Sequence, residues 1–211
     1  MRVLVSDTSI LIDLERADLL RSAFSLDAEF VVPDLLYERE LRDSGGADLR
    51  ALGLRVEPLN ESEVERAQAY RREHPRLALP DTFALTLAKS RRWLLLTGDG
   101  PLRALAVAEQ VECHGVLWLI DHMHTERVVE AAILRVGLEQ LARHPRCRLP
   151  RAEIDVRLVR LGEVPAGAHD NSNSYIVSPV ASAARVLVAE AKFMVVACSG
   201  FVSYLIARTA Q

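Results

Sequence analysis

Four acidic side chains within the first hundred residues carry the clearest chemical signal in this chain: Asp7, Glu38, Asp81 and Asp99. Asp7 comes shortly after the apolar run 3–5, and Asp99 comes shortly after the run 94–96. Such short, continuous apolar runs are typical of parallel strands that are buried on both faces. Ligands of open α/β sheets bind beyond the carboxyl ends of these strands. Carboxylates that gather there repel one another unless protonated or neutralised by a cation, so the pattern indicates a site for a hard divalent metal ion.

Each of these acidic residues also has a simpler structural interpretation. Asp7 could cap the following helix, although Thr8 and Ser9 are better placed to do so, and an acid at the end of a buried strand is costly without a partner. Asp81 falls in the first turn of a predicted helix, where a carboxylate interacts well with the helix dipole. Asp99 lies in a Gly-Asp-Gly turn, a routine position for Asp. Only their joint placement favours a common site.

The second acidic position has two candidates, Glu38 and Glu40, on the helix expected from residue 34 to residue 42. We expect Leu35, Leu36 and Leu41 to form the buried stripe of that helix. Glu38 is three positions from both Leu35 and Leu41, so it should lie beside the stripe. Glu40 is four positions from Leu36 and remains the alternative. On this spacing we expect Glu38 to join the site.

The elements that must position these side chains alternate along the chain. Strands are expected at residues 2–6, 29–32, 54–59, 93–97 and 111–113, and helices begin near residues 8, 34, 60, 80, 101, 116, 126 and 151. Alternating strands and helices predict a parallel sheet with right-handed crossovers. The expected fold class is therefore α/β.

Composition limits the domain count and the compartment. The 211 residues are half hydrophobic, which suits one domain with an appendage, and the net charge of -3 neither requires nor excludes a nucleic-acid partner. Three cysteines, Cys113, Cys147 and Cys198, lack metal-binding spacing and indicate reduced thiols. No secretory signal or bilayer-spanning run is found, so we expect a soluble cytoplasmic protein without a membrane partner.

The character of the chain changes after Glu163. Residues 164–175 have the Pro, Gly, Asn and Ser content of a linker, and residues 175–207 are rich in Ala, Val and Ser with few charges. We therefore expect a main domain over residues 1–161. Residues 162–211 are expected to be a linker and a low-charge C-terminal extension, helical and irregular.

Four short motifs occur in a fixed order within the predicted domain. They are D-T-S at residues 7–9, P-x-x-x-x-E at 33–38, D-x-x-A-L-x-x-A at 81–88 and T-x-D at 97–99. In this order and in this strand and helix context, the chain resembles the PIN-domain nucleases from Met1 to about Leu161. It is most similar to the small bacterial toxin-type members, the VapC-like ribonucleases.

That resemblance implies a three-layer α/β/α domain with a central, mainly parallel sheet, and hydrolysis of RNA phosphodiester bonds at an acidic site that binds Mg²⁺ or Mn²⁺. The implied catalytic and metal-binding residues are Asp7, Glu38, Asp81 and Asp99, and the implied supporting hydroxyls are those of Thr8, Ser9 and Thr97. It further implies the toxin of a toxin–antitoxin pair, with an antitoxin protein as partner, and a homodimer. The alternative is a PIN-fold protein that binds nucleic acid or a regulator without cleaving.

Five arginines lie close in sequence to the acidic residues and are candidates for contacts with RNA phosphates: Arg39, Arg42, Arg91, Arg92 and Arg103. Each also has the ordinary interpretation of a solvated surface charge.

Overall fold

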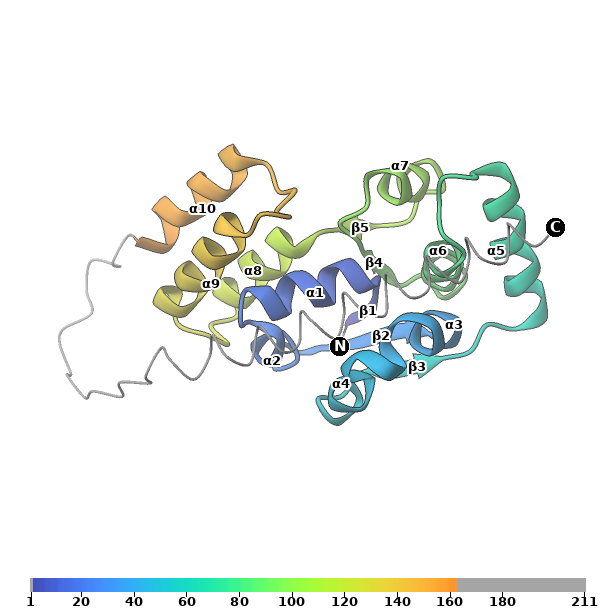
Figure 1. Ribbon diagram of the computed structural model, residues 1–211, viewed down its shortest axis with the longest axis horizontal. Coiled ribbons are helices and arrows are strands. Elements are labelled where there is room, and N and C mark those ends of the chain that lie inside the picture. The colour runs from blue at the N-terminus through green and yellow to red at the C-terminus, as the bar shows by residue number, and fades with distance from the viewer. Residues whose placement is uncertain (1, 163–211) are drawn as a thin grey trace.

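A single parallel sheet forms the centre of the molecule. The computed structural model describes residues 2–162 (Figure 1). The strands are β1 (Arg2–Ser6), β2 (Ala28–Pro33), β3 (Arg55–Glu57), β4 (Leu94–Leu96) and β5 (Cys113–His114). Their order in the sheet is β3-β2-β1-β4-β5, and every neighbouring pair is parallel. The chain thus builds outward from β1 in one direction, then returns to β1 and builds outward in the other.

This order places a topological switch point between β1 and β4. In the register of the sheet Ser6 lies opposite Leu96, so the two strands end at the same level. The backbone N–H of Asp7 extends the pairing by donating to the carbonyl of Leu96 at 3.0 Å. Side chains that directly follow β1 and β4 are therefore brought together at the position where open α/β sheets bind ligands.

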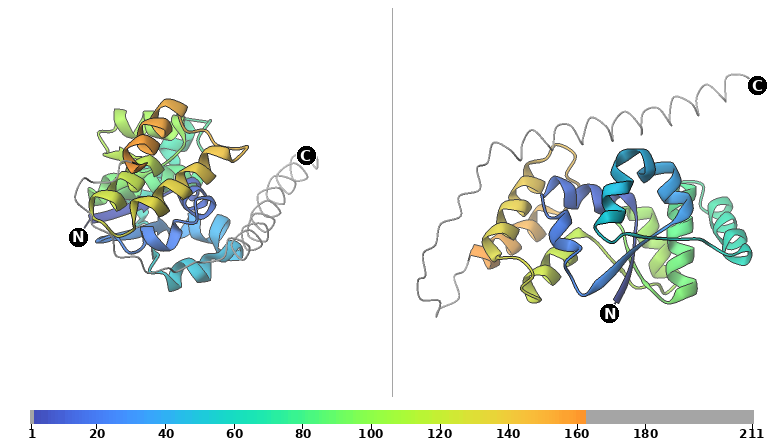
Figure 2. Two further views of the ribbon diagram at one scale, coloured as in Figure 1. Left: turned by 90° about the vertical axis from the view of Figure 1, so that its left-hand side faces the viewer. Right: turned by 90° about the horizontal axis from the view of Figure 1, so that it is seen from below.

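Helices cover both faces of the sheet. They are α1 (Thr8–Arg16), α2 (Leu20–Ala23), α3 (Asp34–Leu36), the π-helical segment η1 (Tyr37–Gly46), α4 (Ala47–Ala51), α5 (Glu61–Glu73), α6 (Leu79–Arg91), α7 (Gly100–Ala108), α8 (Val116–Thr125), α9 (Ala131–Arg143) and α10 (Arg151–Gly162). Figures 1 and 2 show α8, α9 and α10 at one end of the molecule and α5 at the other.

Two hydrophobic cores account for this arrangement, because successive strand residues point to opposite faces of a sheet. Leu4 packs into the core beneath α1, α8, α9 and α10, whereas Val5 packs into the core beneath α6 and α7. In the same way Leu94 and Leu96 face the first core and Leu95 faces the second. The three-layer α/β/α fold predicted from the sequence is thereby confirmed.

Most predicted elements are present, and the differences have local causes. β1 has the predicted bounds, and the predicted break near residue 44 is seen where Ser44 and Gly45 leave helical geometry, Gly45 with a φ of 92°. The helix expected from residue 126 begins only at Ala131, because the chain turns through Arg127, which has a φ of 55°. The helices α2 and α4 were not predicted, since four or five residues are too few to show a helical period.

The described part ends with α10, which is fixed to α8 by ion pairs. The guanidinium of Arg157 donates to both carboxylate oxygens of Asp121, with a shortest distance of 2.7 Å, and Arg160 pairs with the same carboxylate. The predicted extension, apart from Gly162 itself, lies outside the described residues. No helix between residues 2 and 162 is both long and apolar enough to cross a lipid bilayer.

Candidate active site

Asp7 lies at the carboxyl end of β1 and accepts hydrogen bonds from three donors. It is 3% exposed and has extended backbone geometry. Its Oδ1 accepts hydrogen bonds from the backbone N–H of Ile10 at 3.1 Å and from the hydroxyl of Ser9 at 2.7 Å, and its Oδ2 accepts from the hydroxyl of Thr97. Asp7 is therefore the N-cap of α1, and the expectation that Thr8 or Ser9 would cap this helix is wrong. Ser9 instead donates to the Asp7 carboxylate.

The Thr97-Gly98-Asp99 loop is attached to the end of β1 through these same hydroxyls. The backbone N–H of Gly98 donates to Ser9 Oγ at 3.1 Å, and that of Asp99 donates to Thr97 Oγ1 at 2.9 Å. A Cβ on Gly98 would lie 3.0 Å from Ser9 Oγ, so a side chain there would require the Ser9 hydroxyl to shift by a few tenths of an ångström. Asp99 caps α7 by accepting from the backbone N–H of Leu102 at 2.7 Å. The two motifs thus form one hydrogen-bonded unit.

Asp81 lies in the first turn of α6, as predicted. Its Oδ2 accepts from the backbone N–H of Ala78 at 3.0 Å, which closes that turn. Burial raises the pKa of Asp81 to about 6, and the negative charges of Asp7, Glu40 and Asp99 contribute to the rise. The glutamate whose charge acts on Asp81 is therefore Glu40, and Glu38 is not among these charges.

The structure favours Glu40 over Glu38 as the glutamate of the candidate site, which is the reverse of the prediction. The carboxylate of Glu40 accepts a hydrogen bond from the hydroxyl of Thr8, and burial followed by the charge of Asp7 raises its pKa. Glu38 is 52% exposed and pairs instead with Arg42. We therefore replace Glu38 by Glu40 in the candidate site.

The geometry of η1 explains this correction. The prediction assumed the 3.6-residue period of an α-helix, but π-helical turns join residues five positions apart. The fully buried Leu36 and Leu41 are five apart and face the core together, whereas Leu35 is only partly buried. Glu40 precedes Leu41 directly, and its side chain reaches Thr8 at the start of α1.

The four carboxylates of the site form an electrostatically coupled set. The charge of Asp99 acts on Asp7, and the charge of Asp7 acts on Glu40, in each case after burial as the larger cause of a raised pKa. Arg39 is a cation that offsets part of this charge at Glu40. Within residues 2–162, one carboxylate oxygen each of Glu40, Asp81 and Asp99 receives no hydrogen bond.

The carboxylate oxygens of this site are of the kind that binds a hard divalent cation. Mg²⁺ and similar ions prefer oxygen ligands. The oxygens that receive no hydrogen bond belong to side chains that repel one another. No three Asp, Glu, His or Cys side chains among the described residues converge into a ready metal cluster. Glu40, Asp81 and Asp99 would hold the ion through the oxygens that remain free, beside the rigidly held Asp7.

The candidate arginines are mostly engaged elsewhere. Arg91 pairs with Glu63 at 3.2 Å at the C-terminal end of α6, roughly 15 Å along the helix from Asp81 at 1.5 Å per residue. Arg92 follows it at the same end. The guanidinium of Arg103 donates to the carbonyl of Thr97 at 2.7 Å and to that of Cys113 at 3.4 Å, so it supports the Asp99 loop from behind. No feature of the sequence indicated that supporting role.

The fold is that of an α/β/α protein with buried carboxylates near the switch point of its parallel sheet. The family model described as a PIN domain matches residues 3–163, and the chain belongs to the PIN-domain family. PIN domains are generally nucleases and typically use divalent metal ions. No curated protein sequence shows a significant match to this chain.

Proposed function

We propose that this protein is an endoribonuclease that uses Mg²⁺ or Mn²⁺ at the site formed by Asp7, Glu40, Asp81 and Asp99. The observation that carries the proposal is the mutual repulsion of four carboxylates: Asp7 and Asp99 follow β1 and β4, Glu40 contacts Thr8 at the start of α1, and Asp81 senses the charge of all three. Asp7, Asp81 and Asp99 also stabilise the first turns of helices, but burial and like charges disfavour the ionised forms of the set. A bound cation and a substrate phosphate would complete it.

The side chains have distinct roles in this proposal. Glu40, Asp81 and Asp99 offer carboxylate oxygens that receive no hydrogen bond from the described residues, and so serve as ligands. Asp7 accepts hydrogen bonds from Ser9 and Thr97, which holds these hydroxyls in place, and its carboxylate adds negative charge to the site. A divalent cation held there would supply an activated water and would stabilise the leaving oxygen of a phosphodiester.

RNA is the proposed substrate because the D-T-S and T-x-D motifs resemble those of PIN ribonucleases. Single-stranded or loop RNA fits better than duplex RNA, since the bases of an A-form helix are poorly accessible to side chains. The same resemblance supports the toxin of a toxin–antitoxin pair, acting as a homodimer, as the biological setting. Growth arrest on expression, relieved by Asp7→Asn, would test that setting.

The direct test is digestion of labelled single-stranded RNA by purified protein with Mg²⁺ or Mn²⁺, with EDTA, and after metal is added back. We expect cleavage that EDTA abolishes and added metal restores, with none for Asp7→Asn. RNA binding without cleavage in either metal would instead favour the alternative, a PIN-fold protein that binds nucleic acid or a regulator.

A further inference from the structure

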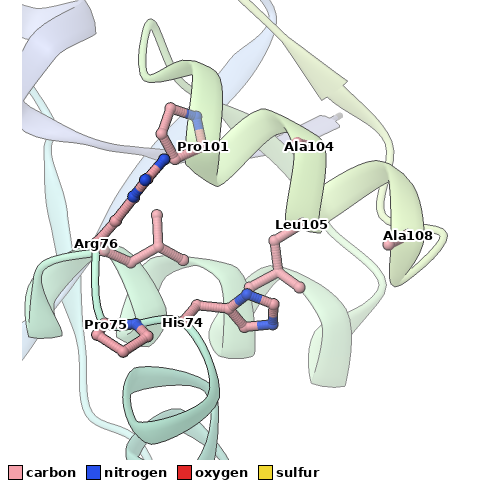
Figure 3. Close-up of a pocket in the computed structure, with 8 residues that line it drawn as sticks. His74, Pro75, Arg76, Pro101, Ala104, Leu105 and Ala108 are labelled. Carbon is pink, nitrogen blue, oxygen red and sulfur yellow. The ribbon is translucent and has the colours of Figure 1, made fainter.

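A pocket of about 330 Å³ opens between the connection from α5 to α6 and the exposed side of α7 (Figure 3). Its walls are mostly apolar and include Leu77, Pro101, Ala104 and Leu105. His74 and Arg76 stand at its rim, and both are exposed. The volume is at the lower end of the range of about 300–1,000 Å³ seen for small-ligand sites. It suits one flat ring rather than an extended molecule.

Each wall of the pocket contains a residue that is close in sequence to an acidic residue of the site or to its hydrogen-bond partner. Pro101 lies two residues after Asp99, so their Cα atoms are at most roughly 7 Å apart. Leu77 directly precedes Ala78, whose backbone N–H donates to the carboxylate of Asp81. The pocket is therefore lined in part by segments that adjoin Asp81 and Asp99 in the sequence.

The rim of the pocket is preformed and positively charged. The guanidinium of Arg71 donates to the carbonyl of Pro75 at 2.9 Å, and the backbone N–H of Leu77 donates to the carbonyl of His74 at 3.0 Å. These bonds fix the connecting loop. In the part of the chain that the structure describes, no acidic side chain pairs with Arg76. Arg76 is thus available to pair with an anionic group. The adjacent apolar walls favour an uncharged one.

We propose that this pocket binds a nucleobase of the RNA strand next to the cleaved phosphodiester bond, with Arg76 on the phosphate of that nucleotide. The inference rests on the proposed ribonuclease function and deepens it, because it makes the pocket a determinant of sequence preference. An aromatic ring joined to a phosphate matches both parts of the site: the ring buries against Leu77 and Leu105, and the charge meets the guanidinium. Contact with these apolar side chains removes the faces of the base from water, which favours binding.

The test compares two phenylalanine substitutions on the same helix. Ala104→Phe fills the pocket, whereas Val107→Phe changes a side chain that is 69% exposed and outside the pocket. Binding of a fluorescent single-stranded RNA octamer is measured by anisotropy in EDTA, so that neither metal nor cleavage contributes. We expect Ala104→Phe to raise the Kd by roughly 5- to 100-fold, and Val107→Phe to leave it within twofold.

A second pair separates the pocket from general electrostatics. Arg76→Ala and Arg72→Ala remove equal charge from neighbouring exposed positions, and only Arg76 lines the pocket. We expect the larger loss of affinity for Arg76→Ala. Cleavage of a random-sequence RNA pool with Mn²⁺ should also show that Ala104→Phe loses the nucleotide preference at one position near the cut.

The outcomes distinguish the pocket from the activity. If Ala104→Phe binds and cleaves RNA like Val107→Phe, or if the wild-type protein binds no RNA octamer, the pocket proposal is overturned. If the wild-type protein binds RNA through the pocket but cleaves none in either metal, the proposed function fails and the binding site stands.

Discussion

The hydroxyl of Thr97 donates a hydrogen bond to the carboxylate of Asp7, across ninety residues of sequence. The bond joins the ends of β1 and β4 at the switch point of the sheet, next to the backbone bond from Asp7 to Leu96. Thr97 is completely buried and also accepts from the backbone N–H of Asp99. One hydroxyl thereby sets the position of two of the four acidic residues.

Thr97→Val should therefore destabilise the fold and weaken the site. The substitution keeps the shape but leaves Asp7 Oδ2 and the Asp99 N–H without their partner, which costs about 1–3 kcal/mol. We expect this loss in urea unfolding, together with a lower rate of metal-dependent cleavage. The control is Thr86→Val, which removes a buried hydroxyl bonded only to the carbonyl of Thr82 within α6. Equal losses for the two variants would contradict the assigned role of Thr97.

The exchange of Glu38 for Glu40 is tested by a matched pair of substitutions. Glu40→Gln should reduce metal-dependent RNA cleavage by about 10²-fold or more, because it removes a ligand charge next to Asp7. Glu38→Gln breaks only an exposed ion pair with Arg42, which contributes little, so its rate should stay near the wild-type value. Initial rates at saturating Mn²⁺ provide the comparison. The reverse ranking would restore Glu38 to the site.

Asp81 should make stability depend on pH when no metal is present. Its pKa in the folded state, about 6, is above the ordinary value of 3.8, so ionisation costs the folded protein stability above about pH 6. The cost decreases as the pH falls from 6 and is absent below the ordinary pKa. The shift corresponds to at most about 3 kcal/mol, and we expect roughly 1–2 because Asp81 is partly exposed.

Asp81→Asn should therefore be more stable than the wild-type protein at neutral pH in EDTA, and should show no advantage near pH 3.5. Urea unfolding at the two pH values measures both differences. An advantage of equal size at both would mean that the gain has a cause other than the charge of Asp81.

Divalent metal should stabilise the folded protein through the same carboxylates. A ligand at about 100 times its Kd stabilises the folded state by about 2.7 kcal/mol, so Mg²⁺ or Mn²⁺ should raise the Tm of the wild-type protein. Asp99→Asn should lose most of this rise while still capping α7, because Asn is also a good cap. A metal-induced shift that is unchanged in Asp99→Asn would place the ion elsewhere.

The strands and three of the four acidic residues of the site could be predicted from the sequence, for identifiable reasons. Buried parallel strands have continuous apolar runs, so β1 and its neighbours were recognisable, and with them the positions of Asp7 and Asp99. Asp81 was recognisable from its place after Pro80. Glu40 was misjudged because the π-helical turns of η1 are a tertiary feature without a clear local signal.

Contacts between distant segments were also not predictable. The pocket forms between residues 74–77 and 101–108, and neither segment indicates it alone. The guanidinium of Arg103 donates to two backbone carbonyls, which only the folded sheet brings within its range, and is therefore not free to contact an RNA phosphate. Arg91 is close to Asp99 in sequence, yet it lies at the opposite end of α6 from Asp81.

The most direct test of the central claim is the initial rate of single-stranded RNA cleavage as a function of Mn²⁺ concentration, for the wild-type protein and for Asp7→Asn of verified fold. We predict a rate that rises to saturation with Mn²⁺ for the wild-type protein and stays at background for Asp7→Asn. Cleavage that is independent of added metal, or that persists in Asp7→Asn, would contradict the assignment of the acidic residues as a metal-dependent nuclease centre.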